Sequence, residues 1–474
     1  MMNEYIDHEW DKAMPTLCEY IKIPNMSPML EEDWKTNGYQ EQAMDLIVNY
    51  VKEQEKEIHG MTYKVHQDDV PEAGSPLLFC EIEAREKVDS GKTILLYGHM
   101  DKQPPLTDKW SEGLGPYKPI IKDGKLFGRG GADDGYSIFA SLIQIKALQK
   151  FGKEHPRIVI MIEGSEESGS CHLPYYVEKL KKEIGNVDLV ICLDSGCANY
   201  DQLWLTNSLR GAFVGKLSVQ VLENEVHSGD AGGIVPAPFR IIRMLLDRLE
   251  NSQTGRTIAD LYVEISEETK KAAQDTAKII GDQIIDRFPY ANGVNVRAFD
   301  KEDILTKYYL RRTWEPCISY IGFGGIPPLD KGGNVIYPKA EMLISVRLPP
   351  TLDPEKAIAS VKQVLVSDPP FNAKVTFESD KWCKGWHSPT LTKDLEKIVD
   401  DVSFSVYGKP VRFMGEGGSI PFMGMLNEKF PQAQFIVTGL LGPDSNAHGP
   451  DESMDIEMAK NVTKCVAGII EKYT

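Results

Sequence analysis

Three short, continuously apolar segments, separated by segments with helical periodicity, constrain the fold of this chain most. They are residues 93–97 (TILLY), 157–162 (RIVIMI) and 188–193 (DLVICL). Between the first two, residues 136–150 carry apolar side chains at helical spacing on one face. Strands that are apolar on both faces and alternate with helices indicate a parallel sheet covered by helices on both sides. We therefore expect an α/β fold.

The pattern changes in the middle of the chain. Residues 212–222 and 341–348 alternate between polar and apolar side chains, as strands with one exposed face do. Towards the carboxyl end, the first pattern of helices and a buried strand returns. We therefore expect an α/β domain made of residues 1–205 and 389–474. An inserted α+β domain with an antiparallel sheet, residues 206–388, interrupts it.

The charge balance and the cysteines limit the partners of the protein. The chain has 70 acidic and 53 basic residues, a net charge of −17. Such a surface repels phosphate backbones and anionic lipids, so we expect neither nucleic acid nor a membrane surface as partner. Its eight cysteines contain no C-x-x-C pair, and neither a secretory signal nor a bilayer-spanning apolar run is visible. These features predict a cytoplasmic protein with reduced thiols.

Five segments rich in carboxylates, histidine or glycine follow the predicted strands or lie in loops beside them. They are His99-Met100-Asp101, residues 128–135 (GRGGADDG), residues 163–169 (EGSEESG), Asp194-Ser195-Gly196 and Asn446-Ala447-His448-Gly449. Because ligands bind at the carboxyl ends of parallel strands, we expect these segments to converge on one crevice. Clustered carboxylates repel one another unless cations neutralise them. Two imidazoles and three carboxylates predict Zn²⁺, with Mn²⁺ or Co²⁺ as alternatives.

Each segment alone also has a plainer interpretation. A His-x-Asp pair is common at a strand edge, where the histidine is simply hydrogen-bonded. Glu166-Glu167 is typical of a solvated helix start. Asp194 suits a helix cap, and Asp133-Asp134 suits a turn. Only the joint occurrence of the five segments favours a metal site.

Together these motifs resemble the M20 metallopeptidase family, and within it the branch of cytosolic non-specific dipeptidases and carnosinase-like enzymes. Further shared motifs are an HSG sequence at His227, an arginine on an inserted-domain strand at Arg347, and a GGSIP loop at residues 417–421. The motifs span residues 99–448 in the family's order. The resemblance implies a two-metal hydrolase that cleaves dipeptides or removes a C-terminal residue from short peptides.

The resemblance also implies the metal ligands: His99, Asp133, Glu167, Asp194 and His448. Asp133 matches the carboxylate that bridges two divalent ions in each subunit. His99 and Asp194 match the remaining ligands of one ion, and Glu167 and His448 those of the other. A pair of such ions polarises a carbonyl and activates water.

Two more carboxylates have implied roles at this site. Glu166 matches the general base that takes a proton from water and returns it to the leaving amine. Asp101 matches the acid that orients the imidazole of His99 and raises its basicity. The family also has a cis peptide bond after the bridging aspartate, here between Asp133 and Asp134. Gly135-Tyr136 departs from the family's usual Lys-Gly, which leaves the ligands intact but puts the local loop shape in question.

The inserted domain holds the other implied site residues. A tetrahedral oxyanion needs a donor besides the metals, and His227 is the candidate. In the family the matching histidine reaches the partner subunit's site, which implies a homodimer formed through the inserted domain. Without the resemblance, His227 is an ordinary turn histidine.

Arg347 matches a clamp for a substrate carboxylate, to which a guanidinium can bind with two parallel hydrogen bonds. Its plainer interpretation is an exposed partner of surface acids. Further substrate-binding positions are implied at Asn334, Gly417, Gly418 and Ser419. The last three also suit a simple strand-to-helix loop.

Three other functions compete with peptide hydrolysis. An N-acyl amino acid deacylase would use the same metal and base residues, although the long insert favours a dipeptidase. A non-catalytic metal- or peptide-binding protein has no use for the general base Glu166. A nucleotide-binding protein is suggested only by glycines 128, 130 and 131, which do not form a G-x-G-x-x-G sequence.

Overall fold

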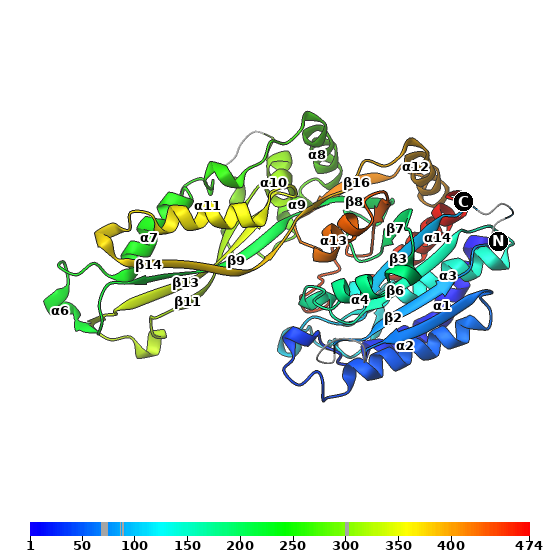
Figure 1. The fold of residues 1–474 in the computed structure, drawn as a ribbon, viewed down its shortest axis with the longest axis horizontal. Helices are drawn as coiled ribbons and strands as arrows, with labels where there is room; N and C mark the ends of the chain where they lie inside the picture. The colour runs from blue at the N-terminus through cyan, green and yellow to red at the C-terminus, as the bar shows by residue number, and fades with distance from the viewer. Residues whose placement is uncertain (68–73, 86, 88–89, 299–302) are drawn as a thin grey trace. The chain divides into compact units, whose positions relative to one another are not determined.

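The computed structural model of the protein describes residues 1–67, 74–85, 87, 90–298 and 303–474. The chain forms two compact units, drawn in Figure 1. Unit 1 consists of Met1–Asn207, Ser388–Met414 and Met425–Thr474. Unit 2 consists of Ser208–His387 and of the short segment Gly415–Gly424, which the sequence analysis had assigned to the α/β part.

A six-stranded sheet forms the centre of unit 1. Its strands, in spatial order, are β1 (Met61–His66), β2 (Leu77–Ile82), β6 (Arg157–Glu163), β3 (Thr93–His99), β7 (Leu189–Cys192) and β17 (Gln434–Val437). Strands β6, β3, β7 and β17 are parallel, whereas β1 and β2 pair antiparallel at one side. The carboxyl ends of four parallel strands therefore lie along one edge of the sheet.

The helices of unit 1 surround this sheet. They are α1 (Met2–Ile21), α2 (Tyr39–Glu55), α3 (Ser137–Lys150), α4 (Leu173–Lys179), α5 (Lys181–Ile184), α12 (Lys393–Tyr407) and α14 (Ile456–Lys472). Helix α13 (Pro421–Lys429) belongs to unit 1 from Met425 onwards and to unit 2 before it. Helix α3 was expected to bury a single face. Instead, every residue from Ser137 to Gln149 is buried, because α1, α2 and α14 pack against the helix in addition to β3.

A small sheet joins two loops of unit 1 that are distant in sequence. It contains β4 (Ile120–Lys122), β5 (Lys125–Phe127) and β18 (Ser453–Asp455). Strands β5 and β18 pair antiparallel, with Phe127 opposite Ser453. The residues just after β5 therefore lie beside those just before β18.

Unit 2 contains a four-stranded antiparallel sheet. Its strands, in spatial order, are β11 (Cys317–Gly324), β13 (Lys339–Leu348), β9 (Gly211–Gln220) and β14 (Lys374–Cys383). Helices α7 (Pro238–Leu249) and α11 (Pro354–Val366) pack on one face of this sheet, as Figure 1 shows. The predicted alternation of β13 is confirmed, since Met342, Ile344 and Val346 all enter this core.

Helices α8 (Glu267–Ile280), α9 (Gln283–Asp286) and α10 (Ile304–Thr313) form a second small core of unit 2 around Ala277 and Tyr309. Two more short strands, β10 (Val226–His227) and β12 (Val335–Ile336), pair with each other. Among the described residues, no helix is both long enough and apolar enough to cross a bilayer. The predicted mixed α/β fold with an additional antiparallel sheet is confirmed.

Candidate active site

The strands and turns of unit 1 carry the predicted ligands to the carboxyl edge of the sheet. His99 is the last residue of β3, and Asp194 lies two residues beyond β7. Glu167 lies in the turn η4 (Glu166–Ser168), which follows β6. Asp133 belongs to the helical turn η3 (Gly131–Gly135) that leads into α3, and His448 lies in the loop between β17 and β18. Segments from five parts of the chain thus meet at one edge.

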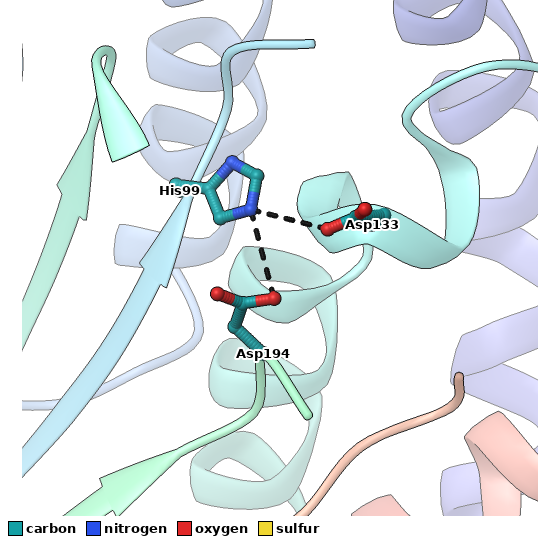
Figure 2. A group of neighbouring side chains, drawn as sticks. All are labelled: His99, Asp133 and Asp194. Atoms are coloured by element: carbon teal, nitrogen blue, oxygen red, sulfur yellow. Dashed lines mark ion pairs between the residues drawn. The ribbon is translucent and has the colours of Figure 1, made fainter. Parts of the chain in front are cut away.

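His99, Asp133 and Asp194 form the first of two potential metal-ligand clusters (Figure 2). Nε2 of His99 lies 3.4 Å from Oδ1 of Asp133 and 3.7 Å from Oδ1 of Asp194. All three side chains are buried. One imidazole nitrogen and two carboxylate oxygens therefore converge on a small buried volume.

Asp133, Glu167 and His448 form the second cluster. Nε2 of His448 lies 3.0 Å from Oδ2 of Asp133 and 3.4 Å from Oε2 of Glu167. The two carboxylate oxygens of Asp133 thus face different histidines. This arrangement suits a carboxylate that bridges two cations.

The chemistry of these residues fits divalent cations. Nε2 of His99 and Oε1 of Glu167 are buried and have no hydrogen-bond partner among the described residues. Burial, followed by the negative charges of Asp133 and Glu166, raises the pKa of Glu167 well above its ordinary value. A cation bound among these carboxylates would offset their mutual repulsion. It would also accept the two unpartnered atoms, Nε2 of His99 and Oε1 of Glu167, as ligands.

The loop that carries Asp133 is held against β3. The peptide bond between Asp133 and Asp134 is cis, which confirms the prediction from the family resemblance. Oδ2 of Asp134 accepts a hydrogen bond from the main-chain N–H of His99 at 3.1 Å. The residue after the shared ligand therefore supports the backbone of the first histidine.

Glu166 belongs to neither cluster, although it directly precedes Glu167, a member of the second cluster. Burial, followed by the charge of Asp194, raises the pKa of Glu166 well above its ordinary value. A carboxylate that is close to the clusters and is not part of them suits proton transfer.

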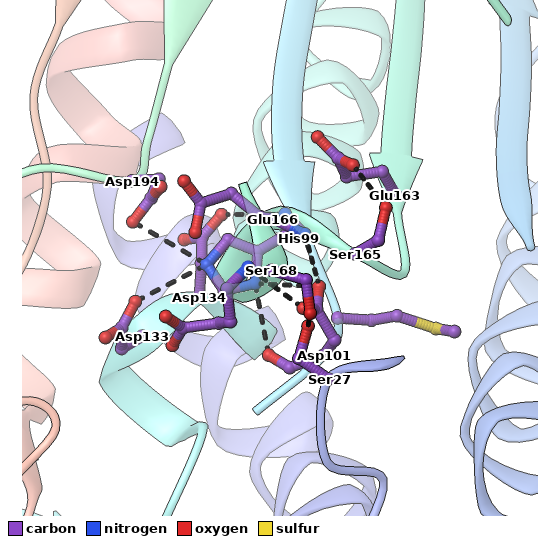
Figure 3. Close-up of polar contacts among 12 residues, drawn as sticks. Ser27, His99, Asp101, Asp133, Asp134, Glu163, Ser165, Glu166, Ser168 and Asp194 are labelled. Atoms are coloured by element: carbon purple, nitrogen blue, oxygen red, sulfur yellow. Dashed lines mark hydrogen bonds and ion pairs between the residues drawn. The ribbon is translucent and has the colours of Figure 1, made fainter. Parts of the chain in front are cut away.

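Asp101 contacts both His99 and the turn that contains Glu166 and Glu167 (Figure 3). Nδ1 of His99 lies 3.1 Å from the main-chain oxygen of Asp101 and 3.5 Å from Oδ1 of Asp101. The Asp101 carboxylate also accepts the main-chain N–H groups of Glu166 and Glu167, each at 3.0 Å. Asp101 therefore fixes the turn that carries both glutamates, a contact that the sequence did not suggest.

Residues 95–472 match peptidase family M20/M25/M40. The chain belongs to this metallopeptidase family. Cysteinylglycine-S-conjugate dipeptidase of Corynebacterium striatum is 27% identical over 404 residues, 83% of either chain. Cys-Gly metallodipeptidase DUG1 of Saccharomyces cerevisiae is 28% identical over 407 residues, 81% of this chain and 80% of the yeast protein. The solved structure of the yeast dipeptidase Dug1p shares the fold, with a TM-score of 0.77, 22% identity, and coverage of 99% and 98% of the two chains.

The point at which the chain departs from the usual M20 pattern has a defined structure. Tyr136 is completely buried, and its hydroxyl donates a hydrogen bond to the main-chain oxygen of Leu193 at 2.5 Å. Leu193 directly precedes Asp194 of the first cluster. A Cβ atom on Gly135 would lie only 2.2 Å from the ring of Tyr20, so glycine is required there by close packing. The departure thus adds a link between the Asp133 loop and the end of β7.

The remaining predicted residues lie in unit 2, where the structure brings them together in two groups. His227 on β10 pairs with Val335 on β12, next to Asn334. Ser228 donates its main-chain N–H to the oxygen of Asn334 at 2.9 Å. In the second group, Nη1 of Arg347 donates to Oγ of Ser419 at 3.1 Å. Gly417 and Gly418 directly precede this serine.

The structure also shows polar residues at this M20 site that the sequence analysis did not single out. Nε2 of Gln103 donates to Oε2 of Glu167 at 2.5 Å. Arg129 and Glu452 form a buried ion pair between two ligand-bearing loops. Arg129 lies within the recognised GRGGADDG segment, and Gln103 and Glu452 each lie a few residues after a recognised motif. This proximity was the only signal that the sequence offered.

Proposed function

We propose that the protein is a dipeptidase that hydrolyses the peptide bond of dipeptides with two divalent cations. One observation carries this proposal: two ligand clusters share Asp133, and Glu166 lies beside them without belonging to either. The names of the related cysteinylglycine and Cys-Gly dipeptidases support a dipeptide substrate. Among metals we propose Zn²⁺ first, with Mn²⁺ or Co²⁺ as alternatives, because the ligands mix imidazole and carboxylate.

When bound, such a pair of cations supplies Lewis acidity towards a carbonyl oxygen and lowers the pKa of water. His99 and Asp194 would hold one cation, Glu167 and His448 the other, and Asp133 both. Glu166 accepts the proton of the attacking water and delivers it to the leaving amine. Asp101 keeps Glu166 in place through the main-chain hydrogen bond.

Unit 2 supplies the groups that recognise the substrate in this proposal. Arg347 binds the terminal carboxylate of the substrate, since its side chain is a positively charged guanidinium next to the Ser419 hydroxyl. Gly417 and Gly418 contribute polar groups beside Ser419, and Asn334 contributes a further polar group next to His227. His227 donates to the oxyanion in the site of the partner subunit, so the protein acts as a homodimer formed through residues 206–388. None of the eight cysteines forms a disulfide in the described part of the chain, which supports a reducing, cytoplasmic location.

A substrate panel tests the proposal. The purified protein, treated with a chelator and reloaded with Zn²⁺, Mn²⁺ or Co²⁺, is assayed on Cys-Gly, β-Ala-His, a tripeptide and an N-acetyl amino acid. We expect the highest kcat/KM on a dipeptide. A higher kcat/KM on the N-acetyl amino acid would replace this proposal with a deacylase. No hydrolysis by any metal form, together with intact metal binding, would favour a non-catalytic binding protein.

A further inference from the structure

His448 is the most exposed of the five proposed ligands. Its side chain is 56% exposed, whereas the side chains of the other four ligands are at most 8% exposed. It also lies in an irregular loop, in which Asn446, His448 and Asp451 all have positive φ angles. Packing alone therefore does not fix this imidazole, and other contacts must hold the loop.

Glu452 anchors that loop from its carboxyl side. Its side chain is fully buried, and Oε2 lies 2.5 Å from Nη1 of Arg129. Oε1 accepts the main-chain N–H of Gly130 at 2.9 Å, and its main-chain oxygen accepts the N–H of Gly128 at 3.0 Å. Every one of these donors belongs to the segment that leads to Asp133.

Arg129 contacts the same loop closer to His448, at the residue that directly follows it. Its Nη2 donates to the main-chain oxygen of Gly449 at 2.8 Å and to that of Pro104 at 3.0 Å. Gly449 directly follows His448, and Pro104 belongs to the loop that begins at His99. The guanidinium is 1% exposed. One buried cation thus connects the loops that carry Asp133 and His448 with the loop that follows β3.

We propose that the buried ion pair between Arg129 and Glu452 is a positioning device for His448, and that it organises the Asp133–Glu167–His448 cluster selectively. The other cluster has separate supports, because His99 ends β3 and receives hydrogen-bonding contacts from Asp134 and Asp101. Asp194 follows β7, whose end is held by Tyr136. The inference rests on the two-metal site of the proposed function and concerns metal binding, not the choice of substrate.

The test is Glu452→Gln. This substitution keeps the size of the side chain and an oxygen that can accept the N–H of Gly130, but it removes the negative charge that faces Arg129. Zn²⁺ binding to the chelator-treated protein is measured by calorimetry without substrate. We expect the first equivalent to bind as in the wild type and the second to weaken by about 10–100-fold, the usual cost of losing a residue that orients a ligand. The matched control is Glu9→Gln, since Glu9 is a buried carboxylate paired with buried Lys146 in the same unit, at 2.6 Å. It should bind both equivalents normally.

A double variant shows whether the effect passes through His448. If it does, Glu452→Gln combined with His448→Ala should bind Zn²⁺ as His448→Ala alone does, because the residue that Glu452 positions is already gone. Additive losses in the double variant, equal weakening of both equivalents, or a matching loss in Glu9→Gln would each overturn the proposal.

Arg129→Lys provides the same test if Glu452→Gln does not fold, as judged by circular dichroism. Lysine keeps a cation opposite Glu452 but lacks the guanidinium fork that reaches Gly449 and Pro104. We expect a selective but smaller loss at the second equivalent. Wild-type binding of both equivalents by a folded Arg129→Lys protein would overturn the role of the guanidinium. Since no substrate is present, these outcomes are independent of whether the protein proves to be a dipeptidase.

Discussion

Replacing Glu166 by glutamine should remove catalysis while preserving the metal site. The substitution changes one oxygen for an NH₂ group and keeps the size of the side chain. The main-chain hydrogen bond from Glu166 to Asp101 remains, so the turn that carries Glu167 should keep its position. Because Glu166 belongs to neither cluster, all five potential ligands remain.

The size of the expected effect follows from the role proposed for Glu166, which is proton transfer and not metal binding. Only proton transfer is lost, and a positioned acid–base group contributes about 10²–10⁴-fold to a rate. At about 1.36 kcal/mol for each factor of ten, the barrier should rise by about 2.7–5.4 kcal/mol. The amide cannot carry the negative charge that burial and Asp194 disfavour at Glu166, so the metal-free variant should be no less stable than the wild type.

Glu167→Gln is the matched comparison, since it makes the same chemical change one residue away. Glu167 is a member of the second cluster, so this variant should bind the second metal equivalent more weakly. Metal content by atomic emission and kcat on the best dipeptide are measured for both variants. Glu166→Gln should therefore lower kcat without lowering the metal content, whereas Glu167→Gln should lower the metal content.

Two results would refute this reasoning. Loss of a metal equivalent in Glu166→Gln with retention in Glu167→Gln would mean that the two roles are reversed. Wild-type kcat in a metal-loaded Glu166→Gln protein would mean that another group transfers the proton.

The other predictions concern metal removal, the buried tyrosine and the dimer. Chelation should abolish hydrolysis and lower the thermal midpoint, because metal at 100 times its Kd stabilises the folded state by about 2.7 kcal/mol per site; calorimetry that shows no shift would contradict the metal site. Tyr136→Phe should lose about 1–3 kcal/mol of unfolding free energy, since it leaves the buried oxygen of Leu193 without its donor; an unchanged denaturant midpoint would contradict this. Mixing inactive His227→Ala and Glu166→Gln subunits at equal amounts should restore about a quarter of wild-type sites if His227 acts across a symmetric dimer. A co-expressed, doubly tagged heterodimer with no more activity than its parents would confine His227 to its own chain.

Periodicity and strand-end motifs predicted much of the fold. The apolar runs at 93–97 and 157–162 became β3 and β6, because a continuous apolar segment is stable only where both of its faces are covered. His99 and Glu167 were found for the same reason, since chemical groups that follow parallel strands share an edge of the sheet. The antiparallel strands β1 and β2 were missed, although β1 alternates between apolar and polar residues and β2 begins with the apolar run Leu77–Cys80.

The sequence by itself therefore determined most of the element types, the family and the five candidate metal ligands that the structure brings together. Only the tertiary structure decided the full burial of α3, the link from Tyr136 to Leu193, and the pairing of Arg129 with Glu452. The last pair is separated by 323 positions in the chain. Local patterns record how one element meets its surroundings, whereas such contacts depend on which distant elements pack side by side.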